Sequence, residues 1–298
     1  MSTFPDLYAA VTARIVAALE AGTPPWIRPW AGVDCDPTPA NATSQRPYRG
    51  INVLLLNLQA MSCGYASNRW LTFQQALGIG ARVRKGEHGT PIVFFKLHEV
   101  EGKVPAPEPN RRVIPLLRSF TVFNVDQVDG LPPALAAPTP ADAVWDPIDE
   151  AERLIGESGA VVRHGGSRAY YAPSDDAIQL PPRGAFGSAS DYYATALHEL
   201  THWTGHPQRC NRPLEGRHAI SAYAFEELVA EMGSAFLCNH CRLPGRLQHA
   251  SYIANWLQAL RNDKRLIFTA ASLAQKAADY LLPKPTEVAA VMPLADAA

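Results

Sequence analysis

Two histidines four residues apart, His198 and His202, most constrain what this chain can fold into, because Glu199 completes with them the pattern H-E-x-x-H. On an α-helix, residues four apart lie on one face, ~6 Å apart along the axis, so two imidazoles at this spacing can bind a single ion. Glu199 then lies beside them, where its carboxylate can reach a water on that ion without ligating the ion. The pattern predicts a metal-binding helix.

The residues around this motif favour a helix with one buried face. Ser188 or Ser190 can cap its start, and Gly205 and Pro207 can end it. The face opposite the histidines is apolar and carries Tyr193, Leu197 and Leu200. Burial of that face would turn the histidines toward a cleft. The alternative is a pair of ordinary helical histidines with no ligand.

Two histidines leave a catalytic zinc ion short of its usual third protein ligand. Residues 222–241 have a helical apolar period, and Glu227 and Glu231 lie together on a second stripe of that helix. The other members of the stripe are small: Ala224, Ser234, Ala235 and Cys238. Because small residues let helices approach closely, we predict Glu227 as the third ligand and Glu231 as the carboxylate that orients a histidine N–H. Glu226 is the competing ligand, at a position that leans toward solvent.

This ligand set is typical of a zincin metallopeptidase, with Zn²⁺ or another divalent ion such as Mn²⁺ in the site. Zinc lowers the pKa of a bound water, and we expect Glu199 to accept a proton as that water attacks a carbonyl and to pass it to the leaving amine. Tyr223 and His206 are candidate oxyanion stabilisers, with a structural role as the alternative for each. A strand predicted at residues 177–180 could bind an extended peptide as an added strand.

Periodicity in the rest of the chain predicts an α+β fold. Residues 1–131 are expected to form a small mixed α/β N-terminal domain. Its predicted elements are helices at residues 6–21 and 49–62, a short helix capped by Thr72, and strands at residues 81–96 and 116–128. Residues 132–147, rich in proline and alanine, predict a linker.

Residues 148–282 are expected to form a mainly helical zincin-like metallopeptidase domain with a small sheet. The predicted strands lie at residues 160–163, 168–172 and 177–180, and the predicted helices at residues 148–156, around His198, and at 222–241, 250–262 and 266–282. Residues 283–298 predict a flexible tail.

The chain has no apolar run of the ~20 residues that a membrane span needs, and residues 1–20 lack a signal-peptide core. Its five cysteines are odd in number and irregularly spaced, which favours reduced thiols over a disulfide framework. We therefore expect a cytoplasmic protein without a membrane partner.

Charge is unevenly distributed. Residues 40–120 contain eleven Lys and Arg against four Glu, a local charge of +7, although the whole chain carries −1. Aromatic residues are interleaved with these cations, as a single strand of nucleic acid requires: Tyr48, Trp70, Phe73, Phe94, Phe95 and Phe120. The predicted DNA-binding residues are Arg46, Arg49, Trp70, Arg82, Arg84, Lys85, Lys96 and Arg118. The alternative is that the aromatics form a core and the charges are solvated.

Several short segments resemble a known family. Residues 46–52 (RPYRGIN), 70–73 (WLTF), 83–87 (VRKGE) and 120–125 (FTVFNV) resemble the N-terminal domain of the ArdC antirestriction and TraC primase-associated proteins of conjugative plasmids. Residues 198–206, 226–231 and 262–280 are similar to the zincin-like metallopeptidase domain that follows it in this family. The resemblance implies an N-terminal domain that binds single-stranded DNA, joined to a metalloprotease-like domain. It also implies protection of incoming plasmid DNA from host restriction during conjugation.

Three functional hypotheses follow. The first is a zinc-dependent peptidase brought to single-stranded DNA, which acts on an unknown protein substrate or host restriction component. The second is a non-catalytic protein that shields single-stranded DNA and has a structural metal domain. The third is a protease that acts on proteins crosslinked to DNA.

Overall fold

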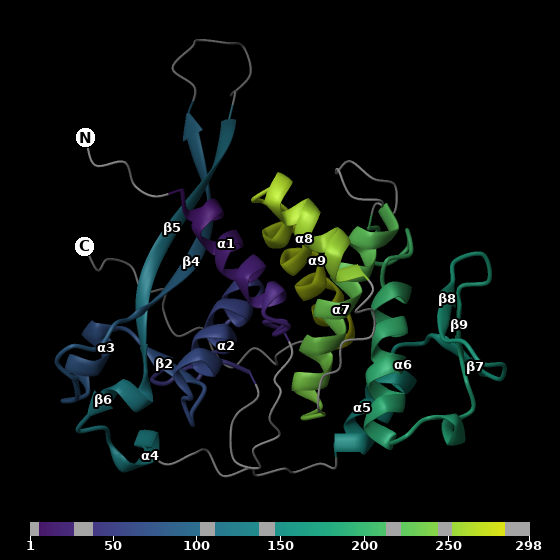
Figure 1. Cartoon of the computed structure of the whole chain (residues 1–298), viewed down its shortest axis with the longest axis horizontal. Helices are drawn as coiled ribbons and strands as arrows, with labels where there is room; N and C mark the ends of the chain where they lie inside the picture. Colours follow the sequence, from purple (N-terminus) through teal and green to yellow (C-terminus); the bar gives the residue numbers. More distant parts are fainter. Residues whose placement is uncertain are drawn as a thin grey trace.

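In the computed structural model, the chain folds into a sheet-containing N-terminal part and a mainly helical C-terminal part that pack side by side (Figure 1). The structure describes residues 6–26, 38–101, 111–136, 147–212, 222–243 and 252–283. The predicted α+β class is confirmed. Of the helices in these ranges, none is both long and apolar enough to be a membrane span.

The N-terminal part is built on a four-stranded sheet of order β1-β2-β5-β4, in which β1 pairs parallel with β2 and the other neighbours are antiparallel. The strands are β1 (Ala40–Asn41), β2 (Arg69–Leu71), β4 (Thr90–Glu101) and β5 (Arg111–Asn124). β3 (Arg82–Val83) pairs separately with β6 (Val128–Asp129). The helices are α1 (Leu7–Glu20), α2 (Ile51–Cys63), α3 (Phe73–Gly78) and α4 (Pro133–Ala136).

Local sequence signals account for most of these elements. Asp6 caps α1, and Thr72 begins α3 with the capping box expected of a Thr followed three residues later by Gln75. Gly64 ends α2 in the left-handed conformation that glycine adopts readily. The short strands β1 and β2 were not predicted, because two or three residues carry too little alternation to be detected.

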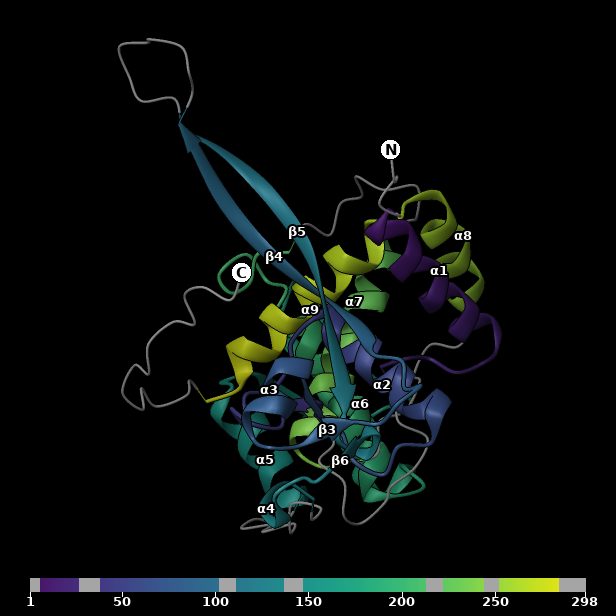
Figure 2. The ribbon, with the colours of Figure 1, turned by 90° about the vertical axis from the view of Figure 1, so that its left-hand side faces the viewer.

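Strands β4 and β5 form a long hairpin whose far end projects away from both parts of the molecule (Figures 1 and 2). At the base of the hairpin, the side-chain amide of Asn52 on α2 bonds the backbone N–H and carbonyl of Val93, at 2.8 Å each. The base is thus fixed to α2.

The C-terminal part combines five helices of the described ranges with a three-stranded sheet of order β7-β9-β8. β9 pairs parallel with β7 and antiparallel with β8, so β9 is the central strand. The elements are α5 (Pro147–Glu157), β7 (Val161–His164), β8 (Tyr170–Ala172), β9 (Ala177–Leu180), α6 (Ala189–Trp203), α7 (Ala222–His240), α8 (Ile253–Asn262) and α9 (Leu266–Leu281). Every helix and strand predicted for this part is present, with ends shifted by a few residues.

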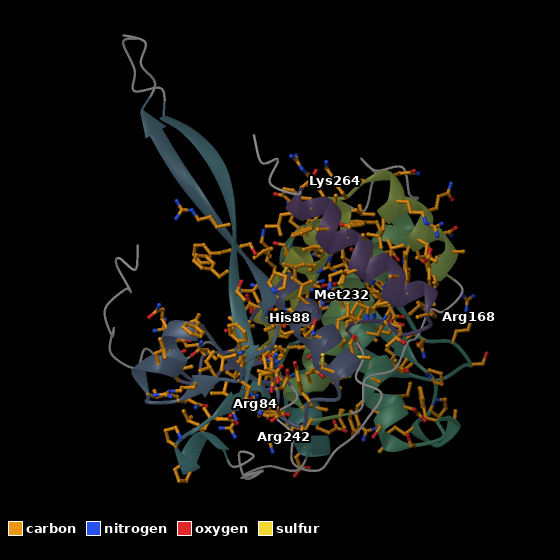
Figure 3. All side chains as sticks on the ribbon, turned by 60° about the vertical axis from the view of Figure 1, so that its left-hand side comes forward. Arg84, His88, Arg168, Met232, Arg242 and Lys264 are labelled. Atoms are coloured by element: carbon orange, nitrogen blue, oxygen red, sulfur yellow. The ribbon has the colours of Figure 1, made fainter. Side chains whose placement is uncertain are left out.

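The two parts share one hydrophobic core. Ile15 of α1 and Leu54 of α2 belong to the same buried cluster as Leu197 of α6, Met232 of α7 and Ile267 of α9. Met232 lies in the middle of the molecule among these side chains (Figure 3). Helices of the N-terminal part therefore support the helices that carry the metal-binding motif.

Candidate metal centre

The helix that carries the H-E-x-x-H motif is fixed at both ends and along one face. The Ser188 hydroxyl accepts the backbone N–H of Asp191, so Ser188 rather than Ser190 is the N-cap. The helix ends at Trp203. Tyr193, Leu197 and Leu200 are buried, as the apolar face predicts.

Helix α7 crosses α6 at very close range, because small residues lie at the contact. A Cβ atom at Gly233 would lie 2.5 Å from Cγ2 of Thr201, so no larger residue fits there without movement. The Ser234 hydroxyl donates to the Ala194 carbonyl at 3.1 Å. This close approach places Glu227 above the two histidines of α6.

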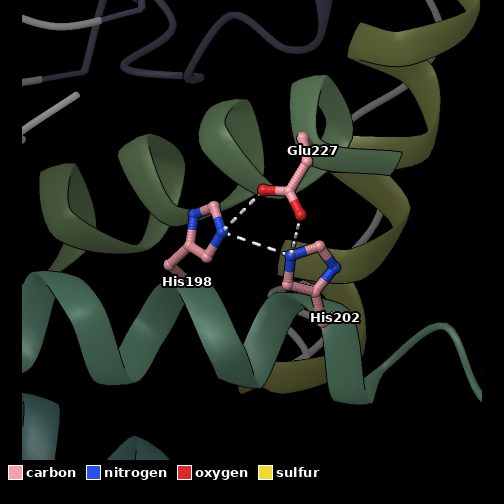
Figure 4. A group of neighbouring side chains, drawn as sticks. All are labelled: His198, His202 and Glu227. Atoms are coloured by element: carbon pink, nitrogen blue, oxygen red, sulfur yellow. Dashed lines mark hydrogen bonds and ion pairs between the residues drawn. The ribbon is translucent and has the colours of Figure 1, made fainter. Parts of the chain in front are cut away.

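The three predicted ligands come together (Figure 4). The Nε2 atoms of His198 and His202 are 3.2 Å apart. One carboxylate oxygen of Glu227 lies 3.4 Å from His198 Nε2, and the other lies 3.6 Å from His202 Nε2. His198 and Glu227 are buried, and His202 is mostly buried.

These separations fit a divalent cation. In a tetrahedral site with metal–ligand distances of ~2.0–2.1 Å, neighbouring ligand atoms lie ~3.3 Å apart, close to the 3.2 Å between the two Nε2 atoms. Glu227 turns one carboxylate oxygen toward each of these nitrogens. Two imidazoles and one carboxylate are ligands that zinc accepts, and imidazole and carboxylate also suit other divalent metals. Three protein ligands leave a coordination position open, which is the arrangement of catalytic rather than structural sites.

Glu226 contacts a histidine Nδ1 atom, a role that the sequence predicted for Glu231; for Glu231 that role stays a prediction. Glu226 Oε1 lies 3.3 Å from Nδ1 of His202. Glu226 is also only 6% exposed, so the expectation that it leans toward solvent is wrong. Glu231 is buried one turn beyond Glu227.

Arg212 explains why Glu226 is turned inward. Its guanidinium is buried and bonds both carboxylate oxygens of Glu226, with Nε at 3.1 and 3.0 Å from them. It also donates to the Thr204 hydroxyl and to the Thr201 carbonyl, at 2.6 Å each. Arg212 therefore ties the end of α6 to α7, a role that no sequence pattern indicated.

These contacts set the charge of the site. Burial lowers the pKa of His202, but the hydrogen bonds to Glu226 and Glu227 outweigh burial and raise that pKa to about 10. Burial would raise the pKa of Glu226, yet its bonds to His202 and Arg212 hold that pKa below its usual value. These shifts favour an imidazolium at His202 beside the ionised carboxylate of Glu226 in the metal-free protein.

A cleft of about 460 Å³ opens beside the ligands. The predicted proton acceptor Glu199 lines it, as do the candidate oxyanion stabilisers His206 and Tyr223. Glu199 is 6% exposed, whereas Tyr223 is 60% exposed. One wall of the cleft consists of residues in and around β8, from Ala169 to Pro173.

The strand beside the cleft is β8, not residues 177–180. That segment forms β9, whose two edges are already paired with β7 and β8. Since an added strand needs an unpaired edge, the prediction that residues 177–180 bind a peptide is wrong. The edge strands of the described sheet are β7 and β8, and β8 is the one that lines the cleft.

Most of the predicted DNA-binding cations are on the surface. The side chains of Arg46, Arg49, Arg82, Arg84, Lys85 and Arg118 are exposed. Arg49 is paired with Asp279, and Arg84 with Glu87 at 2.9 Å. Lys96 is on β4, but its side chain lies outside the described residues.

Trp70 cannot stack on a base in this fold, contrary to the prediction. Its side chain is fully buried, and its indole N–H donates to Asn68 at 3.0 Å. Among the described side chains of this sheet, the exposed aromatics are instead Phe94 and Phe120 on the hairpin, 53% and 47% exposed, with ring centroids 6.2 Å apart.

Two family models match the chain. The model described as the N-terminal domain of anti-restriction factor ArdC matches residues 5–123. The model described as a zincin-like metallopeptidase matches residues 149–273. The interval between the two matches, residues 124–148, contains the proline- and alanine-rich segment.

Known proteins are similar over nearly the whole chain. The crystal structure of the antirestriction protein ArdC from plasmid R388, in a metal-free form, is 44% identical, with a TM-score of 0.78 over 93% of this chain and 96% of that one. Its Mn(II)-bound form gives a TM-score of 0.75 over 93% of this chain and 97% of that one.

Two relatives differ greatly in length. An uncharacterised protein, y4eC, from Sinorhizobium fredii is 43% identical over 93% of this chain and 91% of its own length. A DNA primase TraC of Escherichia coli is 41% identical over 91% of this chain. The chain spans only 26% of that primase.

Proposed function

Because the chain belongs to the ArdC family of antirestriction proteins and carries a zincin-like domain, we propose that it is a metal-dependent peptidase which also binds single-stranded DNA. In this proposal it protects incoming plasmid DNA from host restriction, and its partners are single-stranded DNA and a protein substrate or host restriction component. The observation that carries the peptidase function is the meeting of His198, His202 and Glu227 at tetrahedral spacing beside Glu199.

The side chains around the cleft have distinct roles in peptide hydrolysis. A divalent metal, Zn²⁺ or the Mn²⁺ seen in the R388 protein, would be held by His198, His202 and Glu227 and would lower the pKa of water in the cleft. Glu199 accepts the proton of the attacking water and returns it to the leaving amine. Tyr223 and His206 donate to the developing oxyanion.

The free edge of β8 positions the substrate. An extended peptide that pairs with β8 becomes a further strand of the β7-β9-β8 sheet and lies along the cleft wall. Backbone pairing holds the peptide whatever its sequence, so side-chain pockets must supply any selectivity.

The peptidase function is tested with the full chain, loaded with Zn²⁺ or Mn²⁺, on an unfolded protein such as casein. Glu199→Gln should reduce cleavage by ~10²–10⁴-fold, because only the proton acceptor is lost, while metal content and unfolding temperature stay unchanged. Glu157→Gln, at an exposed carboxylate of α5, is the control and should cleave normally. Cleavage by the Glu199→Gln protein at the control rate would contradict the assignment.

For DNA, the projecting hairpin is the surface best suited to a single strand. Phe94 and Phe120 offer exposed ring faces, and Arg118, which pairs with Phe94 across the hairpin, offers a cation beside them. Bases stack on such rings while a guanidinium contacts phosphate.

The paired substitution Phe94→Ala and Phe120→Ala should weaken single-stranded DNA binding by the full chain at all salt concentrations. Arg118→Gln should make the plot of log affinity against log salt concentration less steep by about 1, the change expected when one phosphate contact is lost. Tyr280→Ala, an exposed aromatic on α9, is the control. Unchanged DNA binding by the variant with both phenylalanines replaced would mean that DNA binds to another surface.

The alternative, a protein that shields DNA without proteolysis, is favoured by one observation. Phe94 and Phe120 are on the projecting hairpin, whereas the metal cleft is in the helical part, so DNA binding at these two rings does not require the cleft. Conjugation of a plasmid into a restricting host separates the two functions. If the Glu199→Gln protein protects the plasmid as well as the unchanged protein does, shielding without proteolysis is favoured.

A further inference from the structure

We propose that the turn between β7 and β8 forms a subsite for an acidic side chain of the peptide substrate. This inference rests on the proposed peptidase function and names its substrate class. The turn has the sequence His164-Gly165-Gly166-Ser167-Arg168. It lines, together with Tyr170 and Gln179, a surface hollow of about 490 Å³.

Arg168 is the cation of this hollow. Other arginines of the C-terminal part already have carboxylate partners: Arg163 pairs with Asp175 at 3.3 Å, Arg183 with Glu152 at 2.5 Å, and Arg209 with Asp176. Arg168 is exposed and, within the described ranges, pairs with no carboxylate. Its guanidinium is therefore available for a bidentate bond to a ligand carboxylate.

The turn is held in place rather than loose. Gly166 has a φ of 66°, a conformation that glycine adopts readily. The amide of Gln179 on β9 donates to the Gly165 carbonyl at 2.8 Å, and His164 Nε2 lies 2.9 Å from the Tyr192 hydroxyl of α6. A fixed turn lowers the entropy cost of binding at Arg168 and Ser167. Arg168 lies at the outer edge of the molecule (Figure 3).

The hollow and the metal cleft adjoin, because Tyr170 lines both. Tyr170 is the first residue of β8, and Arg168 precedes it by two residues. A peptide paired with the free edge of β8 advances ~3.3 Å per residue, so a side chain a few residues from the cleaved bond reaches Arg168. DNA has no backbone that can pair with a strand edge, and this favours a peptide as the occupant.

The test uses full-length Glu199→Gln protein, loaded with Zn²⁺, so that bound peptide is not cleaved. Fluorescein-labelled peptides of about eight residues carry a single Glu at each position in turn, and each is compared with its Gln counterpart by fluorescence anisotropy. At one or two positions the Glu peptide should bind about tenfold more tightly, the size of one charge-assisted contact.

Arg168→Gln should remove this preference, whereas the matched control Arg163→Gln should retain it. Equal binding of Glu and Gln peptides at every position, or a preference that survives Arg168→Gln, would overturn the proposal. A third result would also overturn it: a single-stranded oligonucleotide displaces the peptide from the protein with Arg168 but not from the Arg168→Gln protein. That result would assign the subsite to DNA. The assay measures peptide binding and not cleavage. Its result therefore does not depend on whether the protein proves to be an active peptidase.

Discussion

At the scale of single residues, the site depends on a chain of buried charges rather than on three ligands alone. Arg212 holds Glu226, Glu226 contacts Nδ1 of His202, and Nε2 of His202 faces the metal position. A carboxylate on the far nitrogen fixes the ring orientation and makes the ligand nitrogen more basic. The same carboxylate also stabilises a proton on the metal-free imidazole.

Metal affinity should therefore rise with pH. The pKa of His202 is raised to about 10, so metal-free protein holds a proton there below that pH, and metal uptake must release it. Between about pH 6 and pH 8, affinity for Zn²⁺ should increase by up to about tenfold per pH unit. Calorimetric titration in buffers of different ionisation enthalpy measures the released proton, and binding without proton release would contradict this account.

Arg212→Gln should weaken metal binding by about 10–100-fold, because Glu226 loses the partner that holds it against His202. It should also lower the free energy of unfolding by ~3–5 kcal/mol, since a buried carboxylate is left uncompensated. Chelator competition and denaturant unfolding measure the two effects. Arg163→Gln, at an exposed ion pair, is the control and should change neither quantity measurably.

At the scale of elements, the distance between α6 and α7 decides whether a site exists. His198 and His202 lie on one helix and Glu227 on the other, so a shift of either helix separates the ligands. Gly233 permits the close crossing, because its missing side chain makes room for Thr201.

Gly233→Ala should destabilise the protein by ~1–3 kcal/mol through overpacking and should weaken metal binding as α7 moves outward. A matched control is Gly156→Ala in α5, where an added Cβ meets nothing within 4 Å. That change should stabilise the protein by ~0.5–1 kcal/mol, since alanine favours a helix. Thermal unfolding with and without Zn²⁺ distinguishes the two variants. A Gly233→Ala protein with unchanged stability would argue against close packing of α6 and α7 at this position.

At the scale of the whole molecule, the parts matched by two family models share one hydrophobic core. α1 and α2 belong to the first match but contribute Ile15 and Leu54 to the core beneath α6, α7 and α9. The hairpin base is bonded to α2, so the candidate DNA surface and the metal site share a support.

Ile15→Ala should lower the free energy of unfolding by ~2–5 kcal/mol, because it removes a fully buried side chain from that core. Ile15 is far along the chain from the motif. Even so, Zn²⁺ release and loss of helical signal should both occur at a lower denaturant concentration, and at the same concentration as each other. Leu77→Ala, at an exposed position of α3, is the control. Separate transitions for the two halves would show that the core does not couple them.

The sequence by itself determined most of the elements and two of the ligands. Helical periods and caps such as Ser188 and Thr72 act within a few residues, and the spacing of His198 and His202 fixes both imidazoles on one face. The small residues of α7 also indicated Glu227, because they reveal which stripe a neighbouring helix can approach.

Only the tertiary structure decided how these elements are combined. The order of β7, β9 and β8 makes β8 an edge strand beside the cleft, and strand order is not written in any one strand. The burial of Trp70 and the inward turn of Glu226 depend on neighbours distant in the sequence, above all Arg212. Local patterns report a residue's preference for helix or strand, whereas burial and charge pairing depend on which surfaces meet after the chain has folded.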